Sequence, residues 1–102
     1  MVEYITYKCK KYPFRVSYYA LKKTVDELKE KGIDSSMNNI LNGDLSVYEP
    51  LLYHSLVSGA KATDKELDLK REDIVDVLDE CFLEFTKKLP NFFQIEQKKK
   101  GG

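Results

Sequence analysis

The chain has 102 residues, of which 42% are hydrophobic and 33% are charged, and its formal net charge is zero. A chain of this length can form a single domain with one modest core. Its composition argues against an intrinsically disordered chain. Zero net charge argues against long-range attraction to nucleic acid or anionic membranes.

Residues 3–16 are predicted to form a β-hairpin, because aromatic and β-branched side chains recur along them and every second residue from 12 to 16 is apolar. Residues 8–11 would form the turn, although they lack the Gly or Asn that such turns favour. Pro13 fits an edge strand. Two strands alone are marginally stable, so we expect this hairpin to pack on helices.

Ser17 is the expected N-cap of the next helix, and Gly32 its left-handed stop. Glu27 and Lys31 form an i,i+4 pair that we expect on the solvent side. The spacing of apolar residues predicts a buried face made of Tyr18, Leu21, Val25 and Leu28.

Two helices are expected in the middle of the chain. The first covers 35–42, with Met37, Ile40 and Leu41 facing inward. For the second, Ser46-x-x-Glu49 has the form of a capping box but conflicts with Pro50. We therefore predict a helix with Pro50 at its first position, ending near Val57 or Ser58. Its apolar side would be Leu51, Leu52, Leu56 and Val57.

The last helix is predicted to begin near Lys70 or Arg71 and to stop at Pro90. Its acidic side is expected to be a solvated face, and residues 94–102 a flexible Lys/Gly tail after a single domain over 1–93. The fold class is therefore mainly α (α+β): an N-terminal β-hairpin or short strands followed by a three- to four-helix bundle. The expected buried face of this helix is Ile74, Val77, Leu78, Cys81, Phe82, Phe85 and Leu89, and the acidic face is Asp76, Asp79, Glu80 and Glu84.

Reactive groups are scarce. His54 is the only histidine, and we expect it to be structural. Cys9 and Cys81 are far apart, with no His or Cys at ligand spacing, so zinc binding is not expected and both thiols are interpreted as reduced and part-buried. No phosphate-binding glycine loop is present. The sequence predicts no catalytic residue, metal or cofactor, and therefore no enzyme.

Charge is distributed in blocks: residues 1–31 carry eight Lys/Arg against four Asp/Glu, whereas residues 64–84 carry nine acidic against three basic. Such blocks can orient an assembly or a partner. Neither a signal peptide nor an apolar run long enough for a membrane span is present, so we expect a cytoplasmic protein. Tyrosines among the N-terminal lysines suggest a nucleic-acid surface only weakly, since the rest of the chain is acidic.

An extended segment enters a helix through Ser17-Tyr-Tyr-Ala-Leu21, a middle helix ends in Ser58-Gly59, and an acidic helix closes the chain from Leu69 to Asp79. This order of motifs, over about residues 2 to 90, resembles that of the tail assembly chaperones of long-tailed bacteriophages and prophages. The lysine run 98–100 is similar to what an A-rich frameshift site would encode, and members of the family are commonly made in a short and a frameshifted longer form.

This resemblance implies a chaperone of the host cytoplasm, absent from the mature virion, that keeps the tape measure protein soluble until tail tube subunits polymerise around it. Such a protein needs exposed apolar surface for an amphipathic helix, and self-association into a homo-oligomer is an equally good use of that surface. The alternative is a small phage or bacterial helical regulator that binds nucleic acid or another protein. The candidate partner-binding residues are Phe82, Phe85, Leu89, Phe92 and Phe93, with Leu52 and Leu56 as second choices.

Overall fold

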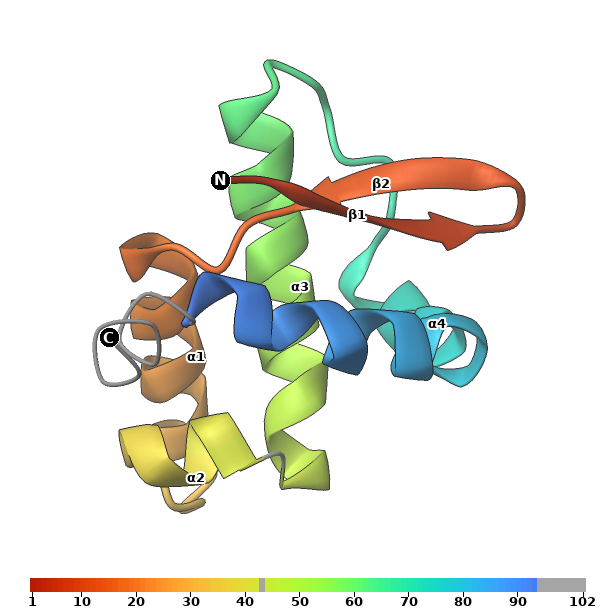
Figure 1. The fold of residues 1–102 in the computed structure, drawn as a ribbon. Helices are drawn as coiled ribbons and strands as arrows, with labels where there is room; N and C mark the ends of the chain where they lie inside the picture. Colours follow the sequence, from red (N-terminus) through yellow and green to blue (C-terminus); the bar gives the residue numbers. More distant parts are fainter. Residues whose placement is uncertain (43, 94–102) are drawn as a thin grey trace, which may run out of the picture.

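The computed structural model describes residues 1–42 and 44–93, so the predicted tail over 94–102 lies outside the described residues. A two-stranded antiparallel hairpin is followed by four helices, which confirms the predicted fold class (Figure 1). No helix in the described part is long and apolar enough to cross a bilayer. The elements are β1 (Glu3–Tyr7), β2 (Lys10–Phe14), α1 (Tyr18–Glu30), α2 (Met37–Asn42), α3 (Leu45–Ala62) and α4 (Ile74–Lys88), with 3-10 turns η1 (Arg71–Asp73) and η2 (Leu89–Phe92) beside α4.

The hairpin turn consists of two residues, Lys8 and Cys9, with φ of 50° and 64°. Positive φ at both central positions is the geometry that matches the twist of the flanking strands, and here it is achieved without glycine. Tyr7 and Lys10 close the turn as a pair. Cys9 is exposed at this tip, which corrects the expectation that both cysteines are part-buried.

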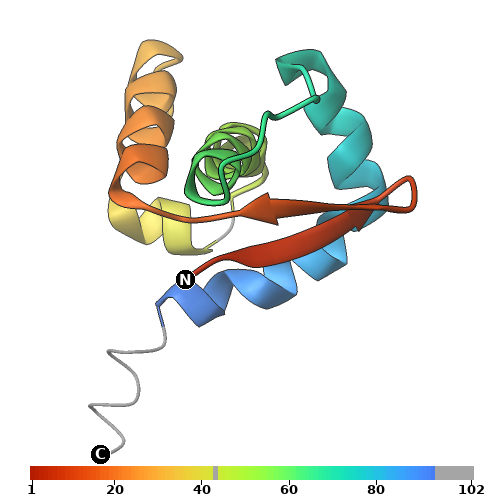
Figure 2. The same ribbon diagram turned by 90° about the horizontal axis from the view of Figure 1, so that it is seen from above.

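Helix α3 is the centre of the molecule, with α1 on one side and α4 on the other, and the hairpin crosses it (Figure 2). The crossing is possible because Gly59 has no side chain: a Cβ there would lie 2.4 Å from the Pro13 carbonyl oxygen. The Arg15 amide also donates to the Ser55 carbonyl at 2.9 Å. Because these contacts hold the end of α3 against β2, the helix continues to Ala62, beyond the predicted end near Ser58.

The predicted start of α3 at Pro50 is wrong. Asp44 is the N-cap, since its carboxylate accepts a hydrogen bond from the Ser46 amide at 2.9 Å, and the helix begins at Leu45. Pro50 is then the sixth helical residue. Its ring is buried in the core, and we attribute its tolerance inside the helix to that burial and to its place near the helix N-terminus.

Helix α1 has the predicted caps, and three residues of its predicted face point inward: Leu28 is fully buried, and Leu21 and Val25 pack against the core. Ser17 Oγ accepts from the Ala20 amide at 3.3 Å, and Gly32 has φ +70°. Tyr18, expected inside, is 81% exposed, whereas Ala20 and Thr24 are completely buried. The Thr24 hydroxyl is satisfied by donating to the Ala20 carbonyl at 2.7 Å, so two small residues can pack inside without an unpaired polar group.

Helix α4 covers the free edge of β1. The Glu84 carboxylate accepts from the Thr6 amide and the Glu80 carboxylate from the Lys8 amide, each at 3.0 Å. On the same edge the Cys81 thiol donates to the Thr6 carbonyl at 3.0 Å. Part of the acidic face predicted to be solvated therefore blocks an edge that could otherwise pair with another strand.

Candidate partner-binding surface

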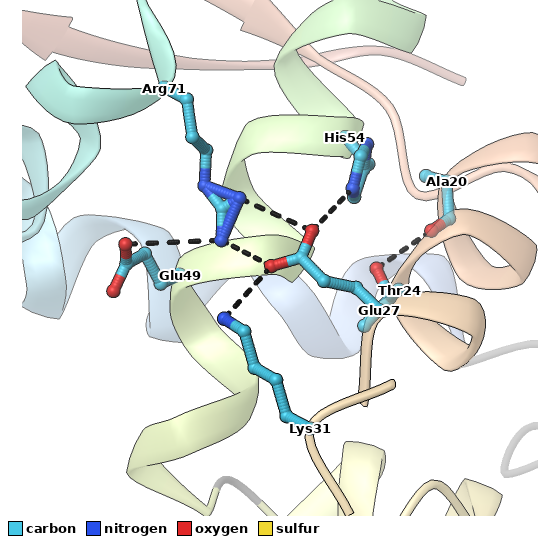
Figure 3. A network of polar contacts seen from close by, with 7 residues as sticks. All are labelled: Ala20, Thr24, Glu27, Lys31, Glu49, His54 and Arg71. Carbon is cyan, nitrogen blue, oxygen red and sulfur yellow. Dashed lines mark hydrogen bonds and ion pairs between the residues drawn. The ribbon is translucent and has the colours of Figure 1, made fainter. Parts of the chain in front are cut away.

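The densest polar cluster surrounds Glu27 (Figure 3). Its carboxylate pairs with Arg71 of η1, with His54 Nε2 of α3 at 3.1 Å and with Lys31 at 3.2 Å. The Glu27 side chain is only 18% exposed, so it does not lie on the solvent side as predicted, although its pair with Lys31 is present. Burial tends to raise the pKa of Glu27, but hydrogen bonds from His54 and Lys31 and the charge of Arg71 outweigh it and lower the pKa.

This cluster is suited to holding elements together. It joins α1, α3 and η1, and Arg71 also stacks over the Tyr53 ring, 5.5 Å from its centroid. Every cation in the cluster faces a carboxylate, and Glu27, His54 and Arg71 line none of the three main grooves in the described part of the chain. We assign it a structural role.

The thiol of Cys81 is likewise held in a structural contact. Burial, together with the nearby carboxylates of Glu80 and Glu84, raises its pKa to about 11. The thiol is therefore protonated at neutral pH and serves as the donor to β1. In residues 1–42 and 44–93, no group of three or more His, Cys, Asp or Glu side chains is placed to hold a metal ion.

Large apolar side chains remain uncovered where α2, the start of α3 and the end of α4 meet. Helix α2 is fixed to the core by Ile40, which is 2% exposed, but the next residue, Leu41, is 49% exposed. Leu45 is the first residue of α3 and projects beyond the packed part of the molecule, with 78% exposure. Met37 is also exposed at 46%. Met37 and Leu41 were predicted to face inward, and their exposure corrects that prediction.

Tyr48 lines two grooves of this surface. Its ring packs edge-on against Phe82, with centroids 5.0 Å apart, and burial raises the pKa of its hydroxyl. The two grooves have volumes of about 340 Å³ and about 360 Å³. The first is lined by Ile40, Leu41, Asn42, Tyr48, Leu51, Thr86, Leu89, Pro90 and Phe93, and the second by Leu45, Tyr48, Leu78, Asp79 and Phe82. We call the two together the junction surface.

The candidate partner-binding residues are divided by the fold. Phe82, Leu89 and Phe93 are half-buried and line the junction surface. Phe92 is half-buried but packs on Phe14 of the hairpin, with ring centroids 5.6 Å apart, and lines neither groove. The remaining candidates, Phe85, Leu52 and Leu56, are fully buried in the core and cannot meet a partner in this structure.

Sequence reasoning missed Leu41, Leu45 and Tyr48 as surface residues. Leu41 fits the apolar period of a short helix, which gives no indication of how far the helix is covered. Leu45 had a usable signal, because it directly follows the acidic residue Asp44, a good N-cap. An apolar residue in the first position of a helix often projects past the structure that the helix packs against.

Comparison of the chain with family models, with curated proteins and with solved structures finds no match. The functional proposal therefore rests on the geometry of the chain's own residues and on the order of motifs in its sequence.

Proposed function

We propose that the protein is a tail assembly chaperone of a long-tailed bacteriophage or prophage, which binds the tape measure protein and keeps it soluble during tail morphogenesis. The observation that carries the proposal is the junction surface, where Leu41 and Leu45 are exposed beside two grooves. The proposed family and the proposed partner come from the order of motifs in the sequence.

The shape of the junction surface suits an amphipathic helix. Two grooves that share the Tyr48 ring as a wall can receive two large side chains from the same face of a helix. The lining residues also supply polar groups, from Asn42, Thr86, Asp79 and the Tyr48 hydroxyl. Such groups can fix the orientation of a bound helix while the apolar contacts supply most of the affinity.

Strand addition is a less suitable mode of binding for this chain. The outer edge of β1 is occupied by Glu80, Cys81 and Glu84, and by Lys88, whose ammonium donates to the Tyr4 carbonyl at 2.6 Å. A partner strand would have to displace these side chains before pairing with the backbone. The proposal is therefore that the tape measure protein binds as a helix, in the host cytoplasm and before the tail tube protein polymerises.

Co-expression tests the proposal directly. The tape measure protein of the same phage genome is produced alone, with the full chain, and with the variants Leu45→Glu and Leu83→Glu. Leu45 and Leu83 are 78% and 79% exposed, but only Leu45 lines a groove, so Leu83→Glu is a matched control.

We expect the full chain and Leu83→Glu to keep the tape measure protein in the soluble fraction and to co-purify with it. Leu45→Glu should do neither, because it places a charge against an apolar partner. A tape measure protein that is no more soluble with the full chain than without it would overturn the proposed function.

A further inference from the structure

Helix α4 and the turn that follows it line three grooves in the described part of the chain, in succession along the helix. Two of them form the junction surface: side chains between 86 and 93 line the first, and side chains between 78 and 82 line the second. Since Asp79 lines both the second groove and the third, the junction surface continues into this third groove. The third groove, of about 420 Å³, is lined by Tyr7, Lys8, Asp76, Asp79 and Glu80.

The continuation changes the charge of the surface. None of the described residues that line the first groove is charged, and Asp79 is the charged residue of the second. Three carboxylates and one ammonium group line the third. Asp79 is exposed and takes part in no ion pair within residues 1–42 and 44–93. The surface therefore has an apolar end, beside Phe93, and an acidic end, beside Asp79.

The positions of the two junction grooves along α4 set the spacing of the side chains that fill them. Leu78 and Phe82 line the second groove, and Thr86 and Leu89 line the first, about two helical turns further along α4. A helix that packs alongside α4 rises by the same amount per residue. It therefore presents its two filling side chains about two turns apart, at positions i and about i+7.

The carboxylate of Asp79 favours one direction for a bound helix of about three turns. A cation that faces Asp79 lies at the acidic end of the surface, close to the side chain that fills the second groove. In a helix antiparallel to α4 this position is in the last turn, where a cation also interacts favourably with the helix dipole. In a parallel helix it is in the first turn, where the dipole opposes a cation.

We propose that the junction surface selects a basic amphipathic helix, antiparallel to α4, with two large apolar residues about seven positions apart and a Lys or Arg in its last turn that faces Asp79. This inference rests on the proposed function, because it describes the segment of the tape measure protein that is bound. An uncharged helix fills the same grooves but leaves Asp79 unpaired, and an acidic helix places a like charge against it. Asp79 is thus the specificity-determining residue of the surface.

Overlapping peptides of the tape measure protein test this selection. Each labelled peptide has about 20 residues, enough for the three-turn segment, and its binding to the full chain is measured by fluorescence anisotropy. We expect the peptides that bind to contain the apolar pair and the cation in the last turn. For the tightest of them, Asp79→Lys should weaken binding about tenfold.

Glu66→Lys is the matched control and should leave peptide binding unchanged. Glu66 is an exposed carboxylate without an ion pair among the described residues, and it lines none of the three grooves. Replacing the cation of the tightest peptide by Glu should weaken its binding to the unmodified chain and restore its binding to Asp79→Lys. This restoration distinguishes a paired charge from a loss of folding.

The same variants in the co-expression experiment separate this inference from the proposed function. Equal recovery of the tape measure protein by Asp79→Lys and Glu66→Lys, when Leu45→Glu recovers none, overturns the inference and leaves the proposed function standing. If the unmodified chain recovers none, and Leu45→Glu changes only the association of the chain with itself, the occupant of the junction surface is a second copy and both proposals fail.

Discussion

The contact between the hairpin and α3 and the junction surface are both built from apolar side chains, but they are packed to different extents. At the first, the backbone of β2 comes so close to α3 that a Cβ on Gly59 would overlap it. At the second, Leu45 is 78% exposed and Leu41 49% exposed. A chain this small has few apolar residues to spare for its own core. Large side chains left uncovered beside a well-packed core therefore indicate a surface kept for another molecule.

Truncation of two neighbouring phenylalanines on α4 should show the largest difference between the core and the junction surface. Phe85 is fully buried against Phe14, with ring centroids 5.2 Å apart, whereas Phe82 is half-buried at the junction surface. We expect Phe85→Ala to lower the free energy of unfolding by about 3–5 kcal/mol. Phe82→Ala should cost about 1–2 kcal/mol, because part of its ring is already in water. Urea unfolding followed by circular dichroism measures both, and equal losses would contradict the division of α4 into core and partner-binding sides.

The close approach at Gly59 can be tested with a second glycine as its control. Gly59→Ala forces the backbones of α3 and β2 apart, and we expect it to lower the free energy of unfolding by about 3 kcal/mol. Gly32→Ala meets no atom within 4 Å and has only the strain of φ +70°, which costs about 1 kcal/mol. A smaller loss at Gly59 than at Gly32, in the same urea experiment, would show that the hairpin can move away from α3 at little cost.

The variant Glu27→Gln tests whether the polar cluster around Glu27 contributes to the free energy of unfolding. Glu27→Gln removes the charge that faces Arg71, His54 and Lys31, and we expect a loss of about 1–3 kcal/mol at neutral pH. Because the folded state lowers the pKa of Glu27 below its ordinary value of 4.5, its contribution is fully present above that pH. The contribution is lost as the pH falls through the folded-state pKa.

The difference between the unmodified chain and Glu27→Gln should therefore shrink as the pH falls below 4.5 and through the lowered pKa of Glu27. Asp26→Asn is the matched control, since Asp26 is an exposed carboxylate 3.5 Å from Lys22. Its effect should stay within about 0.5 kcal/mol at neutral pH. A difference for Glu27→Gln that grows on acidification would show that the carboxylate is not stabilised in the folded state.

The smallest expected effect on folding belongs to Leu45→Glu. Leu45 is almost fully exposed, and an acidic residue in the first turn of a helix interacts favourably with the helix dipole. We expect the free energy of unfolding to change by less than about 0.5 kcal/mol. Since the same variant is expected to abolish binding of the proposed partner, it separates an effect on stability from an effect on binding. A large loss of stability would instead place Leu45 in the packed part of the molecule.

Features that depend on a few neighbouring residues were determined by the sequence. The strand period of the hairpin, the Ser17 cap, the Gly32 stop and the helix that ends before Pro90 all follow from local hydrogen bonds and side-chain spacing. The sequence also placed Phe82, Leu89 and Phe93 among the candidates. It did not distinguish them from Phe85, because the 3.6-residue period gives the direction of an apolar face and not the extent of its cover.

Which faces are covered was decided only by the tertiary structure. Tyr18 is outside and Thr24 inside because α1 packs on α3 through small residues, and Pro50 is inside a helix because the core accepts its ring. The edge of β1 is closed by side chains as distant as Lys88, which is 84 residues from Tyr4 in the sequence. Such contacts depend on how separately formed elements meet in space. The junction surface, being what those contacts leave uncovered, could be recognised only once they were known.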